Sequence, residues 1–177
     1  MALTQGRMTW RHDSVLNYMY SEIRKEAPEG VKVYSDLPGK MVNNTVIPCD
    51  ILVTAGFGSK PDLVIISRES KQIALMELTC PLERNLHKAN SYKSDKYDGM
   101  QSDLESKGWK VYLVPFEVSS RGQILKHTFT TLKHFKIRIK AQQKFIQSMS
   151  KISLLCTFSI FHAYQTKEWV NPAFLRP

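Results

Sequence analysis

Two acidic residues lie in neighbouring apolar runs of the sequence, at positions where their side chains could meet. Asp62 follows Lys60 and Pro61 at the start of one apolar run, and Glu77 lies near the end of the next, inside the run 73–78. If the two runs pair as a hairpin, the start of one lies opposite the end of the other, and the two carboxylates converge. Converging carboxylates are a common way to hold a divalent metal ion such as Mg²⁺.

Each acid also has a simpler interpretation. Asp62 could cap the turn that follows Pro61, and Glu77 could form a salt bridge. A carboxylate among the aliphatic side chains of 73–78 is nevertheless costly to bury without a partner or a metal ion. The position of Glu77 therefore favours a functional pair.

A helix that carries lysines is predicted after the second strand, over residues 82–106. At about 100° per residue, one apolar face collects Leu86, Ala89, Lys93, Tyr97, Met100 and Leu104. Lys93 lies in the middle of this packing face, and Lys96 lies at its margin. A lysine on a packing face indicates acids or an anionic substrate opposite it, although Lys93 could also extend its ammonium group to the rim.

The net charge of +9 lies entirely in one C-terminal block. Residues 118–167 hold no Asp or Glu but nine of the 25 lysines and arginines, which leaves 16 cations for the 16 acids elsewhere. Such a block predicts a polyanionic partner such as DNA; the alternative is a solvated basic face without a ligand. The candidate DNA-binding residues are Lys60, Arg121, Lys126, Lys133, Lys136, Arg138, Lys140 and Lys144.

The order of the helices and strands expected around these residues predicts an α/β fold, with a central mixed sheet flanked by helices and extra helices at the C-terminus. Strands are expected at 31–34, 45–54, 61–66, 72–79 and 109–116. A first helix is expected from an N-cap at Asp13 or Ser14 to just before Pro28. Further helices are expected at 82–106, where Gly108 ends the helix, at 128–135 and at 139–164.

Length and composition predict a single domain over 1–177, with a core over about 10–120 and a basic helical extension over about 121–177. The three cysteines lack zinc-site spacing, and their odd number argues against a disulfide framework. The N-terminal residues are too polar for a signal peptide. The most apolar run, 152–164, is shorter than the roughly 20 residues of a membrane span. We therefore expect a reducing compartment, nuclear or cytoplasmic, without secretion or membrane insertion.

The spacing of Lys60-Pro61-Asp62 and Glu77 resembles the PD-(D/E)XK nucleases, in which two acids hold a metal ion. Their usual lysine comes two residues after the second acid, and that position is Thr79 here. The chain resembles a variant of this family in which the lysine has moved to the following helix: the restriction-like endonuclease domain of site-specific non-LTR retrotransposons and related reading frames in animal genomes. The likeness spans most of the chain and includes Trp10–Leu16, Glu77–Glu83, His87, Lys93, Lys96, Tyr97, Gly108–Val111 and Arg121-Gly122.

The resemblance implies a restriction-endonuclease-like fold and assigns roles to individual residues. Asp62, Glu77 and the carbonyl oxygen of Leu78 would bind Mg²⁺, with Mn²⁺ able to substitute. Lys93 would be the moved lysine, with Lys96 as the competing candidate. Tyr97 would orient the scissile phosphate, and Glu22 would be an auxiliary metal ligand, or else an ordinary helix-surface glutamate.

The function implied is a metal-dependent endonuclease that hydrolyses DNA phosphodiester bonds and nicks target DNA for a retroelement. A reverse transcriptase in the same or another chain is the expected partner, and a homodimer is plausible for a double-strand cut. Two alternatives stay open. One is a DNA-binding module on a nuclease fold that has lost cutting, which Thr79 in place of lysine would suit. The other is a structure-selective nuclease that acts on branched DNA.

Overall fold

The structure, a computed structural model, describes residues 2–52, 60–81, 96–124, 128–140 and 142–169. Its elements are α1 (Ala2–Glu26), β1 (Val31–Ser35), β2 (Leu63–Ser67), β3 (Gln72–Thr79), α3 (Asp98–Ser106), β4 (Lys110–Glu117), α4 (Thr128–His134) and α5 (Gln142–Thr166). The described strands form one sheet in the order β1-β2-β3-β4. β2 runs antiparallel to both β1 and β3, whereas β4 runs parallel to β3. The expectation of an α/β fold with a mixed sheet flanked by helices is confirmed.

The central hairpin matches the sequence prediction closely. β2 and β3 pair antiparallel, with Leu63 opposite Met76 and Ser67 opposite Gln72. Every residue from Ile73 to Leu78 is buried. Covered faces on both sides explain why the middle of each strand is aliphatic on both faces instead of alternating with polar residues.

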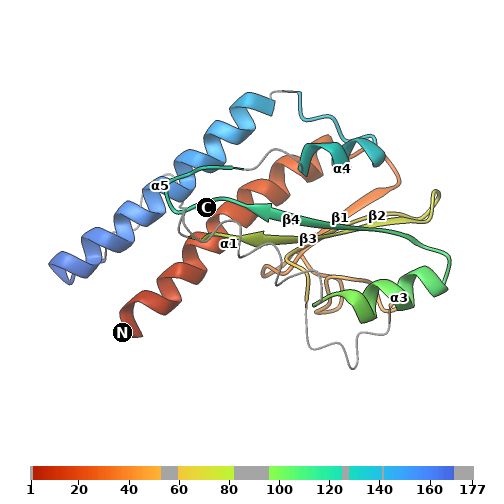
Figure 1. Ribbon diagram of the computed structural model, residues 1–177, viewed down its shortest axis with the longest axis horizontal. Coiled ribbons are helices and arrows are strands. Elements are labelled where there is room, and N and C mark those ends of the chain that lie inside the picture. The colour runs from red at the N-terminus through yellow and green to blue at the C-terminus, as the bar shows by residue number, and fades with distance from the viewer. Residues whose placement is uncertain (1, 53–59, 82–95, 125–127, 141, 170–177) are drawn as a thin grey trace.

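Two hydrophobic layers cover the sheet. On one face Leu63, Ile65 and Met76 pack against α1 and the C-terminal helices, and on the other Val64 and Leu75 pack against α3. Figure 1 shows α1, α4 and α5 on one side of the sheet and α3 on the other. Successive side chains of a strand point to opposite faces, so each strand contributes to both layers.

The strand expected at 45–54 is wrong for its described part, which runs to Leu52. Thr45 forms only an isolated bridge with Val42, and the N–H groups of Ile51 and Leu52 both donate to the carbonyl of Pro48 in a turn. Ile51 and Leu52 are nevertheless buried in the α3-side core. The apolar residues of this segment predicted burial correctly, but Pro48 lacks an N–H group for a ladder and favours the turn instead.

The predicted start of the first helix is also wrong. α1 begins at Ala2, so Asp13 and Ser14 lie within the helix and do not cap it. The hydroxyl group of Ser14 donates to the Trp10 carbonyl four residues earlier, an interaction that satisfies a serine inside a helix. The predicted end is confirmed, because α1 stops at Glu26, two residues before Pro28.

The helix expected over 82–106 is confirmed only in its last part, α3. Residues 82–95, including Lys93, lie outside the described residues. Lys96 and Tyr97 form a turn before α3, so the continuous helix drawn through them in the sequence prediction is wrong. Gly108 adopts a φ of 79° and its N–H donates to the Glu105 carbonyl, which confirms the predicted stop.

The C-terminal helices are part of the main core. α5 packs along α1, and its residues Phe145 and Met149 are buried with Val15 and Met19 of α1. The loop after β4 touches α5 closely, because a Cβ atom on Gly122 would lie 2.7 Å from the Ser150 carbonyl oxygen. Among the described residues no helix is both long enough and apolar enough to cross a membrane.

Candidate active site

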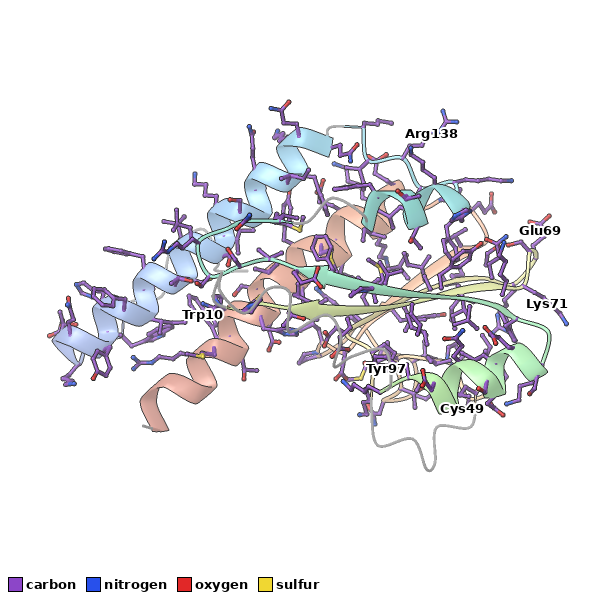
Figure 2. All side chains as sticks on the ribbon, in the orientation of Figure 1. Trp10, Cys49, Glu69, Lys71, Tyr97 and Arg138 are labelled. Carbon is purple, nitrogen blue, oxygen red and sulfur yellow. The ribbon has the colours of Figure 1, made fainter. Side chains whose placement is uncertain are left out.

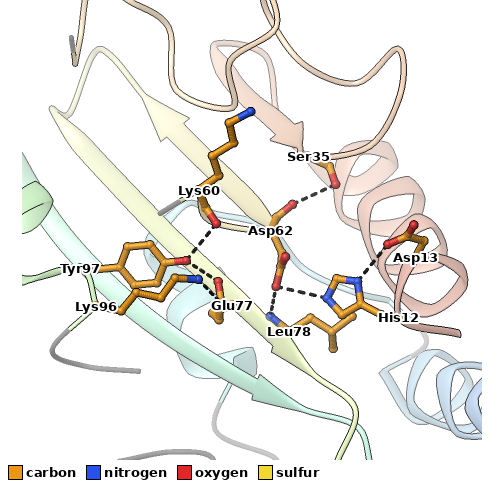
Figure 3. Close-up of polar contacts among 9 residues, drawn as sticks. All are labelled: His12, Asp13, Ser35, Lys60, Asp62, Glu77, Leu78, Lys96 and Tyr97. Carbon is orange, nitrogen blue, oxygen red and sulfur yellow. Dashed lines mark hydrogen bonds and ion pairs between the residues drawn. The ribbon is translucent and has the colours of Figure 1, made fainter. Parts of the chain in front are cut away.

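The hairpin brings Asp62 and Glu77 together at one end of the sheet (Figure 3). Leu63 lies opposite Met76 in the antiparallel register, so Asp62, one residue earlier, lies opposite Glu77, one residue later. The predicted convergence of the two acids therefore follows from a register that the two aliphatic strands impose. Their carboxylates come from neighbouring strands and are held by different partners.

Asp62 is held by three parts of the chain. Its Oδ2 atom accepts the Leu78 N–H at 2.7 Å and lies 3.3 Å from Nε2 of His12 on α1. Its backbone carbonyl accepts the Ser35 hydroxyl at 3.0 Å and the Asp36 N–H at 2.9 Å. Both contacts of the carboxylate fall on one oxygen, and together they fix the orientation of the side chain.

Glu77 is only 9% exposed and is held by the turn that precedes α3. The Lys96 ammonium group lies 3.0 Å from Oε1, and the Tyr97 hydroxyl group donates to Oε2. The Tyr97 hydroxyl also lies 3.1 Å from the Lys60 carbonyl oxygen. The buried carboxylate thus has both a charged and a neutral donor, as a buried acid requires.

The two carboxylates change the titration of their neighbours. Burial tends to lower the pKa of His12, but the hydrogen bonds and negative charges of Asp62 and Asp13 outweigh it and raise this pKa to about 9. His12 is therefore an imidazolium at neutral pH. Burial, followed by the hydrogen bond to Glu77 and the charges of Glu77 and Asp62, raises the pKa of Tyr97, so its hydroxyl group stays protonated and can donate.

His12 is a residue of the site that the sequence prediction did not include. A helix that starts at Asp13 leaves His12 at its edge, where a histidine usually caps or packs. The longer α1 places His12 inside the helix, on the face that carries Val15, Leu16 and Met19 at helical spacing. A usable signal was therefore present, because a polar residue in register with a buried helical stripe faces the core or a site.

Other predicted site residues lie at varying distances from the pair. Leu78 contacts Asp62 through its N–H, and metal binding by its carbonyl stays a prediction. Lys93 lies outside the described residues. Glu22 lies ten residues beyond His12 on α1, about 15 Å along the helix axis, so α1 places it away from the pair.

The predicted DNA-binding cations lie mainly on another part of the surface. Lys133, Lys136, Arg138, Lys140 and Lys144 are exposed around α4 and the start of α5. Figure 2 shows Arg138 and Tyr97 on opposite sides of the sheet. Lys60 is exposed beside the pair and Arg121 is exposed in the loop after β4, whereas Lys126 lies outside the described residues. A phosphate bound at Arg138 would therefore lie away from the carboxylates.

The donor set fits Mg²⁺ in its chemistry. Carboxylate oxygens are the ligands that Mg²⁺ prefers, and it is commonly bound by one or two carboxylates together with water and substrate phosphate. Among the described residues no three His, Cys, Asp or Glu side chains gather into a metal-binding group. The Asp62–Glu77 pair therefore suits an ion that keeps several water ligands. The cationic groups of His12 and Lys96 supply positive charge of the kind that such an ion would bring.

Comparison with models of known protein families finds no match to this chain, and a search of curated proteins finds none either. What the pair can do must therefore follow from its own chemistry.

Proposed function

We propose that the chain is a Mg²⁺-dependent endonuclease of the PD-(D/E)XK type that hydrolyses a DNA phosphodiester bond. The observation that supports this most is the cross-strand pairing of Asp62 and Glu77 at one end of the sheet, with a lysine and a tyrosine on the same carboxylate. These residues would hold Mg²⁺, or Mn²⁺ in its place. The bound ion would lower the pKa of a water ligand and offset the charge that develops on the phosphate.

The chain's own residues complete this proposal. His12 keeps Asp62 in one orientation, and the Leu78 N–H does the same from the strand. Lys96 is exposed and lies 3.0 Å from Glu77, so its ammonium group can also face a phosphate oxygen. Tyr97 keeps a protonated hydroxyl group, which donates to Glu77; to position the same phosphate, this hydroxyl group would have to turn from the acid to the phosphate oxygen. Lys93 remains a second candidate for the role of Lys96.

DNA is the proposed substrate because of the acid-free basic block. Lysines and arginines that contact phosphates hold a duplex in place without reading its sequence. Since Arg138 and Tyr97 lie on opposite sides of the sheet, a duplex held by the block would have to pass around the sheet edge to reach the pair. In a retroelement the nick would supply a 3′ end to a reverse transcriptase, and a double-strand cut would call for a homodimer.

A DNA-binding module that does not cut is the second candidate. Two observations favour it: Thr79 stands where the lysine of the usual motif lies, and His12 and Lys96 already neutralise both carboxylates. A protein that has exchanged its metal ion for internal ion pairs would keep its fold and its basic surface. This module and the nuclease differ in a single measurable property, which is metal-dependent cleavage.

The test is a nicking assay on supercoiled plasmid DNA with Mg²⁺ or Mn²⁺. Asp62→Asn and Glu77→Gln should each slow nicking by at least about a hundredfold, while binding measured in EDTA persists. Glu69→Gln is the matched control, because Glu69 is an exposed acid in the turn between β2 and β3. Wild-type binding without nicking would reject the nuclease in favour of the module. Linear, flap and four-way substrates then separate general from structure-selective cutting.

A further inference from the structure

The second half of α5 carries a row of exposed aromatic side chains that the carboxylate pair does not use. Phe158, Phe161 and Tyr164 are 63%, 56% and 62% exposed, and Leu154 one turn earlier is exposed as well. The opposite side of the helix, which includes Met149, is buried, so the core does not need these rings. Several large apolar side chains gathered on one exposed surface mark an interaction site. Phe158, Phe161 and Tyr164 are called the aromatic row below.

Cations accompany the aromatic row, and α5 itself contains no Asp or Glu, although a single exposed acid, Glu168, follows Lys167 after the helix. Lys167 Nζ lies 4.9 Å from the centre of the Tyr164 ring. Nearby, the guanidinium group of Arg7 on α1 lies 4.6 Å from the ring of Trp169. A second copy of α5 on this face would set lysines against lysines with no acid on either helix to pair them. Charge complementarity therefore favours a polyanion as the occupant.

The aromatic row begins near the end of the strand that carries Glu77. The buried guanidinium group of Arg11 donates to the Cys80 carbonyl at 2.7 Å and to Thr157 Oγ1 at 3.0 Å. Cys80 lies three residues after Glu77, and Thr157 immediately precedes the aromatic row. Figure 1 shows the first turns of α1 and the last turns of α5 extending side by side beyond the strand ends. A nucleic acid strand that left the pair in this direction would run along α5.

The spacing of the rings suits nucleotide bases. The three side chains recur every three residues, so successive ones lie about 4.5 Å apart along the helix axis and are turned by about 60° around it, a separation of the same order as the roughly 3.4 Å step of stacked bases. Every base has a π-face, so aromatic rings can stack on a strand without regard to its sequence. In a duplex the neighbouring base pairs cover these faces, so only unpaired bases offer them to a protein.

We propose that the aromatic row stacks on unpaired bases of a DNA strand that adjoins the scissile phosphate, while neighbouring lysines such as Lys167 contact its backbone. This proposal rests on the proposed nuclease function for the identity of the substrate and makes it more specific. It assigns to the enzyme a substrate with a single-stranded portion, such as a flap or a fork, in preference to a continuous duplex.

The test compares two labelled probes by fluorescence anisotropy in EDTA, where no cutting occurs: an oligothymidine strand and a mixed-sequence duplex of the same length. Phe161→Ala should weaken binding of the single strand about tenfold and change duplex binding by less than about twofold. Gln147→Ala is the matched control, because Gln147 is exposed on the same side of α5 but lies toward its start. It should leave both affinities unchanged, and thermal melting should show that both variants are folded.

Besides unchanged strand binding by Phe161→Ala, three results would overturn this proposal. The first is that Phe161→Ala lowers the affinity for strand and duplex equally. The second is that the wild type sediments as a dimer and Phe161→Ala as a monomer. The third is that binding to phosphatidylserine vesicles depends on Phe161 while strand binding does not. Failure of the nuclease proposal looks different. Row-dependent strand binding without Mg²⁺-dependent nicking rejects only the nuclease, whereas Asp62-dependent nicking with unchanged strand binding by Phe161→Ala rejects only the stacking.

Discussion

Asp62 and Glu77 lie next to each other, but different layers of the fold hold them. Asp62 is held from the side of the large core by His12 of α1, and Glu77 is held from the side of α3 by Lys96 and Tyr97. Each carboxylate thus has a cation from its own layer. The pair lies where the two layers meet. A substitution that loosens one layer should therefore disturb the acid held by that layer more than the other acid.

Truncation of one core leucine in each layer should have the largest effect on stability and should show most clearly whether the two layers differ. Leu16 on α1 and Leu104 on α3 are both almost completely buried. Leu16→Ala should lower the free energy of unfolding by about 4 kcal/mol and Leu104→Ala by about 2 kcal/mol. The reason is that α1 is packed against both the sheet and α5, so its cavity cannot close, whereas α3 can move inward. Urea denaturation measures both values, and an equal loss would show that the two layers are alike.

Removal of the His12 imidazolium should come next and, of the two paired carboxylates, should act on Asp62 and not on Glu77. Its pKa is raised to about 9 in the folded chain from 6.5, so its stabilising effect is complete below pH 6.5 and is lost as pH rises through about 9. His12→Gln should therefore be less stable than wild type by at most about 3 kcal/mol at pH 6, with a difference that shrinks toward pH 10. Unfolding curves in EDTA at several pH values test this. A difference that stays constant with pH would mean that His12 acts by packing.

Loss of the Tyr97 hydroxyl group should have a smaller effect and should act on Glu77. Tyr97→Phe keeps the ring in the α3-side core but removes a donor from a buried carboxylate, which should cost about 1–2 kcal/mol of stability. The loss should be much the same at pH 6 and pH 8, because the hydroxyl group stays protonated over this range, unlike the change caused by His12→Gln. Guanidinium denaturation at the two pH values checks it. A loss below the measurement error would mean that Lys96 and water satisfy Glu77 unaided.

The hairpin and its pair of acids could be predicted from the sequence because they depend on local patterns. Two aliphatic runs joined by a short polar turn fix the register, and the register alone brings Asp62 opposite Glu77. The fourth strand and the stop at Gly108 are similarly local. Each of these features is encoded within about ten residues of the place where it appears.

The rest depends on contacts between distant parts of the chain. Residues 45–52 are apolar because they cover the sheet, and composition cannot distinguish a covering loop from a strand. His12 reaches Asp62 from inside α1, which extends back to Ala2, beyond the point where its apolar pattern begins. Lys96 and Tyr97 reach Glu77 from a turn, whereas the sequence pattern favours a helix there.

Gly122 gives α5 a fixed register along the sheet. Its backbone lies against Ser150, where any side chain would meet the helix, and the Ser153 hydroxyl donates to the Ser119 carbonyl at 2.8 Å. With Thr157 tied to Arg11, the helix is pinned at successive turns and cannot slide. Under the proposed function, the end of α5 that extends beyond the strands would set the distance between the stacked bases and the carboxylates. A slip of α5 by one turn would then move the first stacked base about 5.4 Å relative to the carboxylates, and the cut would move by one or two nucleotides.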